Sequence, residues 1–168
     1  VIGHVGRFAE QKNHLFLIDV FAEFKKKNND VTLLMVGNGN LEPQIRQKVT
    51  NLGLSDSVIF AGVRTDIPQL MSAMDVFVMP SFFEGMPNTV IEAQATGLPC
   101  VIADTITLEA DITGLIKYLP LENPDIWAEA ALAAVCPERP ITTEMIIKNK
   151  YDINSVAREF THLVFGES

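Results

Sequence analysis

Short apolar runs, each followed by a segment with helical spacing, recur through the N-terminal two thirds of this chain. The runs expected to be strands are Val1–Gly6, Val31–Gly37, Ser57–Gly62, Asp75–Ser81 and Pro99–Asp104. They are nearly continuous in apolar residues rather than alternating, which is typical of parallel strands covered on both faces. Strands that alternate with helices through right-handed crossovers predict an α/β fold, a Rossmann-like doubly wound parallel sheet with helices on both faces.

The helices expected between these strands are Asn13–Asn28, Leu41–Leu52, Asp66–Ala73 and Pro87–Thr96. Beyond Asp104 the pattern weakens to a short strand over Ile116–Leu119 and helices over Asp125–Val135 and about Ser155–Val164. We expect residues 1–168 to form a single domain, because 48% hydrophobic residues suffice for a sizeable core. The chain opens within a predicted strand and without a methionine, so we expect it to be a fragment of a longer protein.

Charge and cysteine usage narrow the function classes. The chain has 13 basic against 21 acidic residues and a net charge of -8, which disfavours a nucleic-acid surface. Its two cysteines show no metal-ligand spacing and favour a reducing compartment. No apolar stretch reaches the roughly 18 residues of a membrane span, and no signal peptide is visible. The sequence therefore predicts a cytoplasmic protein without a transmembrane segment.

Ligands of a doubly wound sheet bind beyond the carboxyl ends of its strands, so the residues that follow each strand are the candidates for a site. After the first strand stand Gly6, Arg7 and Lys12. Gly6 allows close approach of the backbone, Arg7 can donate to two phosphate oxygens at once, and Lys12 adds a point charge at the start of the next helix. These residues favour an anionic ligand, although a solvated loop remains the alternative.

The segments after the second and third strands are less informative. "GNGNLE" (Gly37–Glu42) lacks the third glycine of a dinucleotide-binding fingerprint, so turn chemistry is the preferred interpretation, and the P-loop pattern is absent. Gly62, Val63 and Arg64 follow the third strand, where backbone groups could contact a nucleobase edge or Arg64 could simply lie on the surface.

The segment "SFFEGMPNTVIEAQATGLPC" follows the fourth strand and holds two glutamates eight positions apart. Pro87 suits a first helical turn, which predicts free amides at the helix mouth that face an anion. These amides belong to Gly85, Met86, Asn88 and Thr89. Glu84 could accept hydrogen bonds from hydroxyls and Glu92 from a vicinal diol, and both carboxylates are expected to face a solvent-filled cleft. Taken alone, each glutamate is equally typical of a solvated helix end.

Together these motifs resemble the C-terminal, donor-binding half of the retaining family-4 (group 1) glycosyltransferases with the two-domain B fold. The resemblance is carried by Gly6, Arg7 and Lys12, by "IFAG" before a short helix, and by "DVFVMPSFFEGMPNTVIEAQATGLPCVIAD". It extends more loosely through "GLIKYLPLENPDIWAEA". The two carboxylates, Glu84 and Glu92, fit the E-x7-E signature of that family.

The resemblance implies a role for each matching residue. Arg7 and Lys12 correspond to the diphosphate clamp, Glu84 to the residue that faces the donor sugar, and Glu92 to the one that holds the nucleoside ribose. It thereby assigns catalysis to Arg7, Lys12 and Glu84, and donor binding to Gly6, Arg64, Gly85, Met86, Asn88, Thr89 and Glu92. The loop Asp104–Thr113 lacks the glycine that usually precedes its glutamate, so Glu109 receives no role.

The resemblance further implies transfer of a sugar from a nucleoside diphosphate to an acceptor hydroxyl with retention, without a metal or other cofactor, and with UDP-sugars favoured over GDP-sugars. The acceptor would bind to an N-terminal domain that is missing here, so the fragment alone should be inactive. The Asp104–Thr113 loop points to bacterial surface or exopolysaccharide synthesis, with peripheral membrane association of the full protein at the inner face of the membrane. The alternatives are a nucleotide-sugar epimerase or hydrolase of similar architecture, and a non-catalytic nucleotide-binding module.

Overall fold

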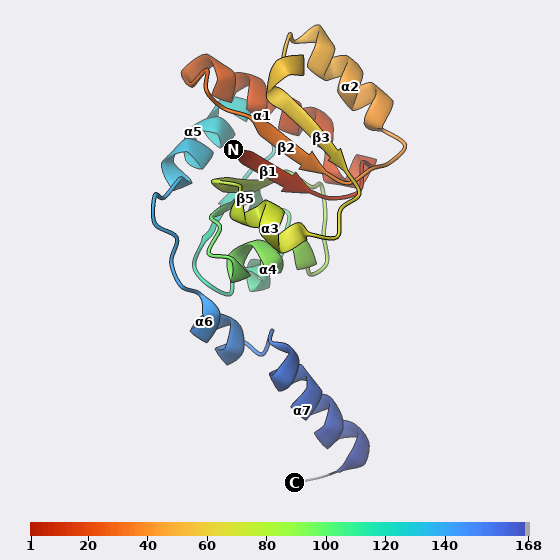
Figure 1. The fold of residues 1–168 in the computed structure, drawn as a ribbon, viewed down its shortest axis with the longest axis vertical. Coiled ribbons are helices and arrows are strands. Elements are labelled where there is room, and N and C mark those ends of the chain that lie inside the picture. Colours follow the sequence, from red (N-terminus) through yellow and green to blue (C-terminus); the bar gives the residue numbers. More distant parts are fainter. Residues whose placement is uncertain (167–168) are drawn as a thin grey trace.

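The computed structural model describes residues 1–166 and arranges the strands among them in one six-stranded sheet (Figure 1). The strands are β1 (Ile2–Val5), β2 (Leu33–Val36), β3 (Val58–Gly62), β4 (Val76–Met79), β5 (Cys100–Ala103) and β6 (Ile116–Leu119). They pair in parallel in the order β3-β2-β1-β4-β5-β6. This order confirms the predicted doubly wound sheet, including the weak sixth strand.

Burial explains why the strands are apolar almost throughout. Every residue of β1, β2, β4 and β5 is buried, whereas the edge strands β3 and β6 are partly open. Inner strands lie between two helical layers and so cannot alternate apolar with polar residues.

The helices are α1 (His14–Lys27), α2 (Glu42–Asn51), α3 (Ile67–Ser72), α4 (Asn88–Ala95), α5 (Pro124–Ala134), α6 (Thr143–Lys148) and α7 (Ile153–Phe165). Right-handed crossovers place α1 and α2 on one face of the sheet and α3 and α4 on the other. Helix α5 returns to α1, where Lys27 pairs with Asp125 at 2.8 Å and with Glu129 at 3.1 Å. The same face buries Trp127 completely.

Three local predictions need correction. Pro87 precedes α4 as its cap, with an extended ψ of 98°, rather than lying in the first helical turn. Lys12 does not open α1 but ends a 3-10 turn over Glu10–Lys12, and Asn13 follows in the left-handed region with φ of 52°. Helix α6 was not predicted, because its six residues are too few to show a clear apolar period.

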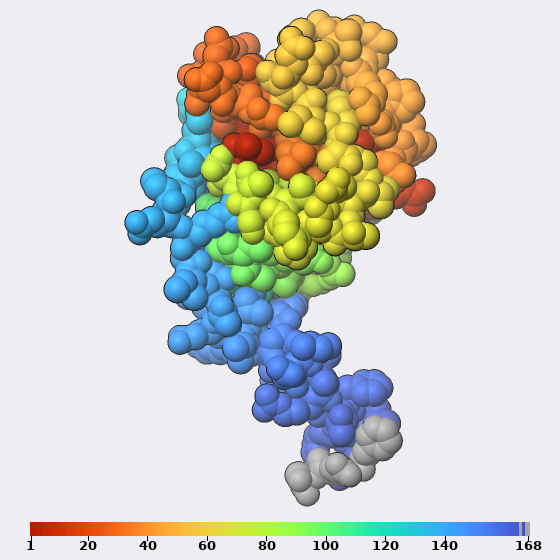
Figure 2. Space-filling view, viewed as in Figure 1, coloured from red at the N-terminus to blue at the C-terminus, as the bar shows by residue number. Residues whose placement is uncertain are grey.

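The C-terminal segment crosses the amino ends of β4 and β5 before it leaves the body. Arg139 donates to the carbonyl oxygens of Met74, Ser72 and Thr96, and Thr142 Oγ1 donates to the Gln94 carbonyl at 2.8 Å. Helices α6 and α7 then extend from the rounded body as an arm (Figures 1 and 2). Among the described residues, no helix is long and apolar enough to cross a membrane.

Candidate functional site

The strand order reverses between β1 and β4, which pair with each other although two strands, three α-helices and two 3-10 helices lie between them in sequence. Loops that leave two such strands separate at the carboxyl edge of the sheet and form a crevice for ligands. Here the two loops are tied together, because the Phe82 amide donates to the Gln11 carbonyl at 2.8 Å. The residues predicted after the first and fourth strands therefore meet at the switch point.

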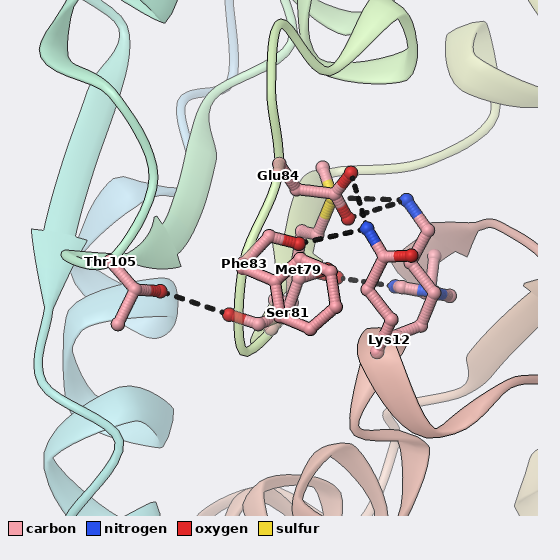
Figure 3. Close-up of polar contacts among 9 residues, drawn as sticks. Lys12, Met79, Ser81, Phe83, Glu84 and Thr105 are labelled. Carbon is pink, nitrogen blue, oxygen red and sulfur yellow. Dashed lines mark hydrogen bonds and ion pairs between the residues drawn. The ribbon is translucent and has the colours of Figure 1, made fainter.

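An ion pair joins the two loops. Lys12 Nζ lies 2.7 Å from Glu84 Oε1, and the two side chains are only 16% and 10% exposed (Figure 3). Gln11 Nε2 donates to Glu84 Oε2 at 3.2 Å and to the Phe83 carbonyl at 2.9 Å. The expectation that Glu84 faces a solvent-filled cleft is thus wrong: its carboxylate is largely covered and is held by Lys12 and Gln11.

The local backbone explains how Lys12 reaches Glu84. The 3-10 turn and the left-handed Asn13 end the loop before α1 begins, which turns the Lys12 side chain back over the end of β1. A Cβ at Gly6 would lie 3.3 Å from Lys12 Cε and 3.1 Å from His4 Nε2. Both contacts are tighter than normal, so glycine at this position leaves room for the Lys12 stem.

The two arginines differ in their surroundings. Arg7 is exposed, and within residues 1–166 its side chain has no hydrogen-bond or ion-pair partner. Arg64 instead donates to both carboxylate oxygens of Asp66, at 2.8 and 2.7 Å. This contact raises the pKa of Arg64 and lowers that of Asp66. Arg7 is therefore free to reach an anion, whereas the charge of Arg64 is already balanced.

The mouth of α4 presents the amides that the sequence predicted. The amides of Val90 and Ile91 donate to the Pro87 carbonyl. The four preceding amides have no backbone acceptor within the described part of the chain, and they belong to Gly85, Met86, Asn88 and Thr89. A Cβ at Gly85 would meet nothing within 4 Å, so the space beside these donors is open. Unpaired amides at a helix start favour a negative group.

Glu92 lies one turn inside α4 and is exposed. Gln94, two residues further on, is completely buried and forms hydrogen bonds within the protein. It donates to the carbonyls of Val90 and Ala110 and accepts from the amides of Ile112 and Thr113. This side chain therefore fixes the loop after β5 to α4, a role that sequence reasoning missed.

Sequence reasoning also missed three buried polar side chains close to these loops. His4 and His14 contact each other edge to face, with ring centroids 4.7 Å apart, and Ser81 is fully buried after β4. His4 Nδ1 donates to the Val78 carbonyl at 2.8 Å, which leaves His4 Nε2 as an acceptor. Burial is the largest cause that lowers the pKa of His4 to about 4 and that of His14 to about 2. The neighbouring His4 contributes to the shift of His14, and the charge of Lys12 contributes to both shifts. Both rings are neutral, and their position in an apolar pattern gave no signal for this.

The glycines after β2 serve close packing. A Cβ at Gly37 would lie 2.1 Å from the Gly6 carbonyl oxygen, and one at Gly39 would lie 2.3 Å from the Phe8 carbonyl oxygen. The "GNGNLE" loop therefore supports the β1–α1 loop from behind, in keeping with the preferred turn interpretation. In the described residues, no group of three or more His, Cys, Asp or Glu side chains is placed to hold a metal ion.

A doubly wound parallel sheet with cations and free amides at its switch point defines a Rossmann-like α/β domain with a candidate anion site at its carboxyl edge. The chain belongs to the glycosyl transferases group 1 family, whose model matches residues 1–136. The resemblance stated from the sequence is thereby confirmed at the level of the family.

Two curated relatives illustrate the match. A putative glycosyltransferase, EpsF of Bacillus subtilis, is 41% identical over 157 residues, which cover 90% of this chain and 41% of the relative. A UDP-Gal:alpha-D-GlcNAc-diphosphoundecaprenol alpha-1,3-galactosyltransferase of Escherichia coli is 39% identical over 104 residues, which cover 60% of this chain and 27% of the relative. The chain thus spans less than half the length of these relatives.

Solved structures share the fold. HepE of Anabaena in complex with UDP and glucose superposes with a TM-score of 0.79 at 24% identity, over 99% of this chain and 48% of that one. A TarM variant of S. aureus, in complex with UDP and other ligands, superposes with a TM-score of 0.79 at 23% identity. The match covers 96% of this chain and 34% of TarM.

Proposed function

We propose that this chain is the donor-binding half of a retaining glycosyltransferase, which moves a sugar from a nucleoside diphosphate to an acceptor hydroxyl. The observation that carries the proposal is the Lys12–Glu84 pair at the switch point. A cation and an acceptor for hydroxyls are joined there, between the unpaired Arg7 and the α4 amides. One end of this arrangement suits a diphosphate and the other suits a sugar.

The chemistry of the reaction gives each group a task. When the bond to the sugar breaks, negative charge grows on the leaving diphosphate. Lys12, held by Glu84, and the amides at the α4 mouth stabilise that charge because their donors are already oriented before the reaction. The exposed Arg7 adds a further positive charge that can reach the phosphates. The proposal uses no metal ion, since these groups supply the positive potential themselves.

The carboxylates hold the two ends of the donor. Glu84, fixed by Gln11 and Lys12, keeps acceptor capacity for hydroxyls of the transferred sugar. Glu92, exposed one turn inside α4, accepts from the two ribose hydroxyls. The base would lie beyond Gly62 and Arg64, where Asp66 keeps the arginine side chain occupied.

The relatives support the finer parts of the proposal. UDP occupies solved structures that share the fold, and the E. coli relative is named for a UDP-galactose donor, so we propose UDP-sugars ahead of GDP-sugars. Curated relatives include enzymes of lipopolysaccharide core and Vi polysaccharide biosynthesis. We therefore propose a role in bacterial surface or exopolysaccharide synthesis, at the cytoplasmic side of the membrane, with a further domain of the whole protein binding the acceptor.

Calorimetry on the purified chain tests the proposal. UDP should bind in the presence of EDTA, and Arg7→Ala should weaken UDP by about 1.5–3 kcal/mol, the usual loss of a charge-assisted contact, while uridine binding stays unchanged. Arg46→Ala, another exposed arginine, which pairs with Glu42 on α2, is the matched control. Binding that requires added Mg²⁺ or Mn²⁺ would overturn the metal-free donor site, and an equal loss of UDP and uridine would mean that the phosphates do not lie at Arg7.

A further inference from the structure

Gln11 is a polar side chain at the switch point to which the sequence assigned no role. It is the middle residue of the 3-10 turn before α1 and is partly buried. Successive residues of a 3-10 turn point about 120° apart, so Gln11 and Lys12 can approach one group from two directions. That group is the Glu84 carboxylate. Its Oε1 lies 2.7 Å from Lys12 Nζ (Figure 3), and its Oε2 accepts from Gln11 Nε2 at 3.2 Å.

Both amide hydrogens of Gln11 have acceptors, because Nε2 also donates to the Phe83 carbonyl at 2.9 Å. A reversed amide would place its own oxygen against a carbonyl and a carboxylate, with no hydrogen between them, so these contacts define its orientation. The Gln11 carbonyl in turn accepts from the Phe82 amide at 2.8 Å. One residue thus contacts three successive residues of the loop that carries Glu84.

Two bonds restrict the carboxylate more than one does. A single bond from Lys12 would leave the carboxylate able to rotate about its Cγ–Cδ bond, whereas a bond to each oxygen fixes its plane. A carboxylate has about four lone-pair sites, so each oxygen keeps capacity to accept from a hydroxyl. Lys12 and Glu84 are only 16% and 10% exposed, so little water competes with these bonds.

The absence of charge on the Gln11 amide separates its task from that of Lys12. The Lys12 ammonium has three donors and, in the proposed function, divides them between Glu84 and the diphosphate. Gln11 has both donors engaged within the loop. We infer that Gln11 is a positioning residue, which keeps the Glu84 carboxylate aimed at the donor sugar while Lys12 contacts the diphosphate. The inference rests on the proposed function, since it requires Glu84 to bind the sugar.

Calorimetry in EDTA tests it, with UDP and with UDP-glucose, UDP-galactose and UDP-N-acetylglucosamine as ligands. Gln11→Met keeps the length of the side chain and the backbone bond to Phe82 but removes both donors. It should weaken the tightest-binding UDP-sugar by about tenfold, the worth of one hydrogen bond to a charged group, and change UDP affinity by less than about twofold. In a Glu84→Ala background the same substitution should cause no further loss, because Gln11 acts through Glu84. Gln11→Asn, whose amide is one methylene too short to bond both partners, should repeat the selective loss and serves if Gln11→Met lowers the melting temperature.

Two controls separate the positioning of Glu84 from the joining of loops. Thr105→Val removes another hydrogen bond to the same loop, from Thr105 Oγ1 to the Ser81 carbonyl at 3.1 Å, which does not involve Glu84 (Figure 3). Gln47→Met removes the donor of an exposed glutamine on α2. Both variants should bind UDP and the UDP-sugar as the original chain does.

The outcomes distinguish this inference from the proposed function. Equal losses of UDP and the UDP-sugar in Gln11→Met would overturn the inference and mean that Gln11 only joins the loops. A further loss in the Glu84→Ala background would overturn it as well, and so would a loss in Glu84→Ala without one in Gln11→Met. Unchanged UDP-sugar affinity in Glu84→Ala would instead refute the contact between Glu84 and the sugar in the proposed function, and the inference with it.

Discussion

At the scale of single residues, the Lys12–Glu84 pair changes what each glutamate is expected to do. Glu84 neutralises a cation that the sequence assigned to the diphosphate, while Glu92 is exposed on the α4 surface. Removing Glu84 leaves Lys12 mostly covered and unpaired, but free to contact a phosphate. Removing Glu92 frees no charge. The two carboxylates should therefore be separable by ligand and by stability.

We predict that Glu92→Ala weakens UDP and a UDP-sugar alike, by about 1–3 kcal/mol, because both carry the ribose diol. Glu84→Ala should weaken the UDP-sugar by a similar amount and leave UDP at least as tight as before. Only Glu84→Ala should lower the melting temperature, since the Lys12 charge loses its partner. Calorimetry and thermal denaturation check both points, with Glu109→Ala as an exposed control. Unchanged affinity of both variants for both ligands would mean that neither glutamate contacts the donor.

The buried histidines predict a sensitivity to acid. Folding lowers the pKa of His4 from 6.5 to about 4 and that of His14 from 6.5 to about 2. Below pH 6.5 the unfolded chain therefore binds more protons at these histidines than the folded chain does. The free energy of unfolding should then fall with decreasing pH from about 6.5 to 4, with about 1.4 kcal/mol per pH unit from each histidine. Above pH 6.5 neither contributes to the pH dependence.

Urea denaturation between pH 7.5 and pH 5 checks this, with His14→Leu as the comparison variant. The slope of unfolding free energy against pH should decrease by about 1.4 kcal/mol per pH unit in the variant, even if its absolute stability is lower. A variant with the same slope as the original chain would show that His14 is protonated in the folded state.

At the scale of secondary-structure elements, the sequence predicted the strands and helices that have a periodic apolar pattern, and it missed the turns that depend on a few residues. Apolar runs and helix spacing located every strand, and an eight-residue helix α4 was placed within one residue at each end. The left-handed Asn13 and the 3-10 turn before it depend on a few residues in a loop and leave no periodic signal. For that reason the direction of Lys12 could not be predicted, although its presence near the switch point could. The pairing of Lys12 with Glu84 depends on contact across 72 positions.

Gln94 gives a prediction for α4 and the loop it holds. Gln94→Leu keeps the volume of the side chain but leaves the Ala110 carbonyl and the Ile112 amide without their partner. We expect a loss of about 3 kcal/mol in unfolding free energy, since buried polar groups then remain unpaired. Hydrogen exchange should also accelerate in residues 106–113.

Gln47→Leu is the matched control on α2, where the glutamine is exposed and donates to Asn51 Oδ1. Its effect should stay within about 0.5 kcal/mol. Equal effects of the two substitutions, or unaltered exchange in the loop of the Gln94 variant, would mean that α4 and the loop hold together by apolar packing alone.

At the scale of the whole molecule, the body and the C-terminal arm differ in how they are held. The segment between α5 and α6 crosses the amino ends of β4 and β5 and is called the crossing segment below. Its residues Arg139 and Thr142 donate to carbonyls at the ends of α3 and α4. A Cβ at Gly97 would lie 2.4 Å from the Pro140 carbonyl oxygen, so the crossing segment packs closely against the turn after α4. By contrast, Ile153 and Leu163 on α7 are 77% and 78% exposed. Stability should therefore depend on the crossing segment and hardly at all on α7.

We predict that a chain ending at Lys150 unfolds within about 1 kcal/mol of the original chain, because α7 buries little apolar surface against the body. A chain ending at Val135 should lose about 3 kcal/mol or more, since the carbonyls that accept from Arg139 and Thr142 lose their donors.

Arg139→Ala in the chain that ends at Lys150 isolates the contribution of the guanidinium, with Lys117→Ala, an exposed cation on β6, as its control. Urea denaturation followed by circular dichroism measures the original chain and these four variants. A large loss of stability on removing α7 alone would mean that the arm folds back onto the body in solution. Equal stability of the two truncated chains would mean that the contacts of the crossing segment do not stabilise the body.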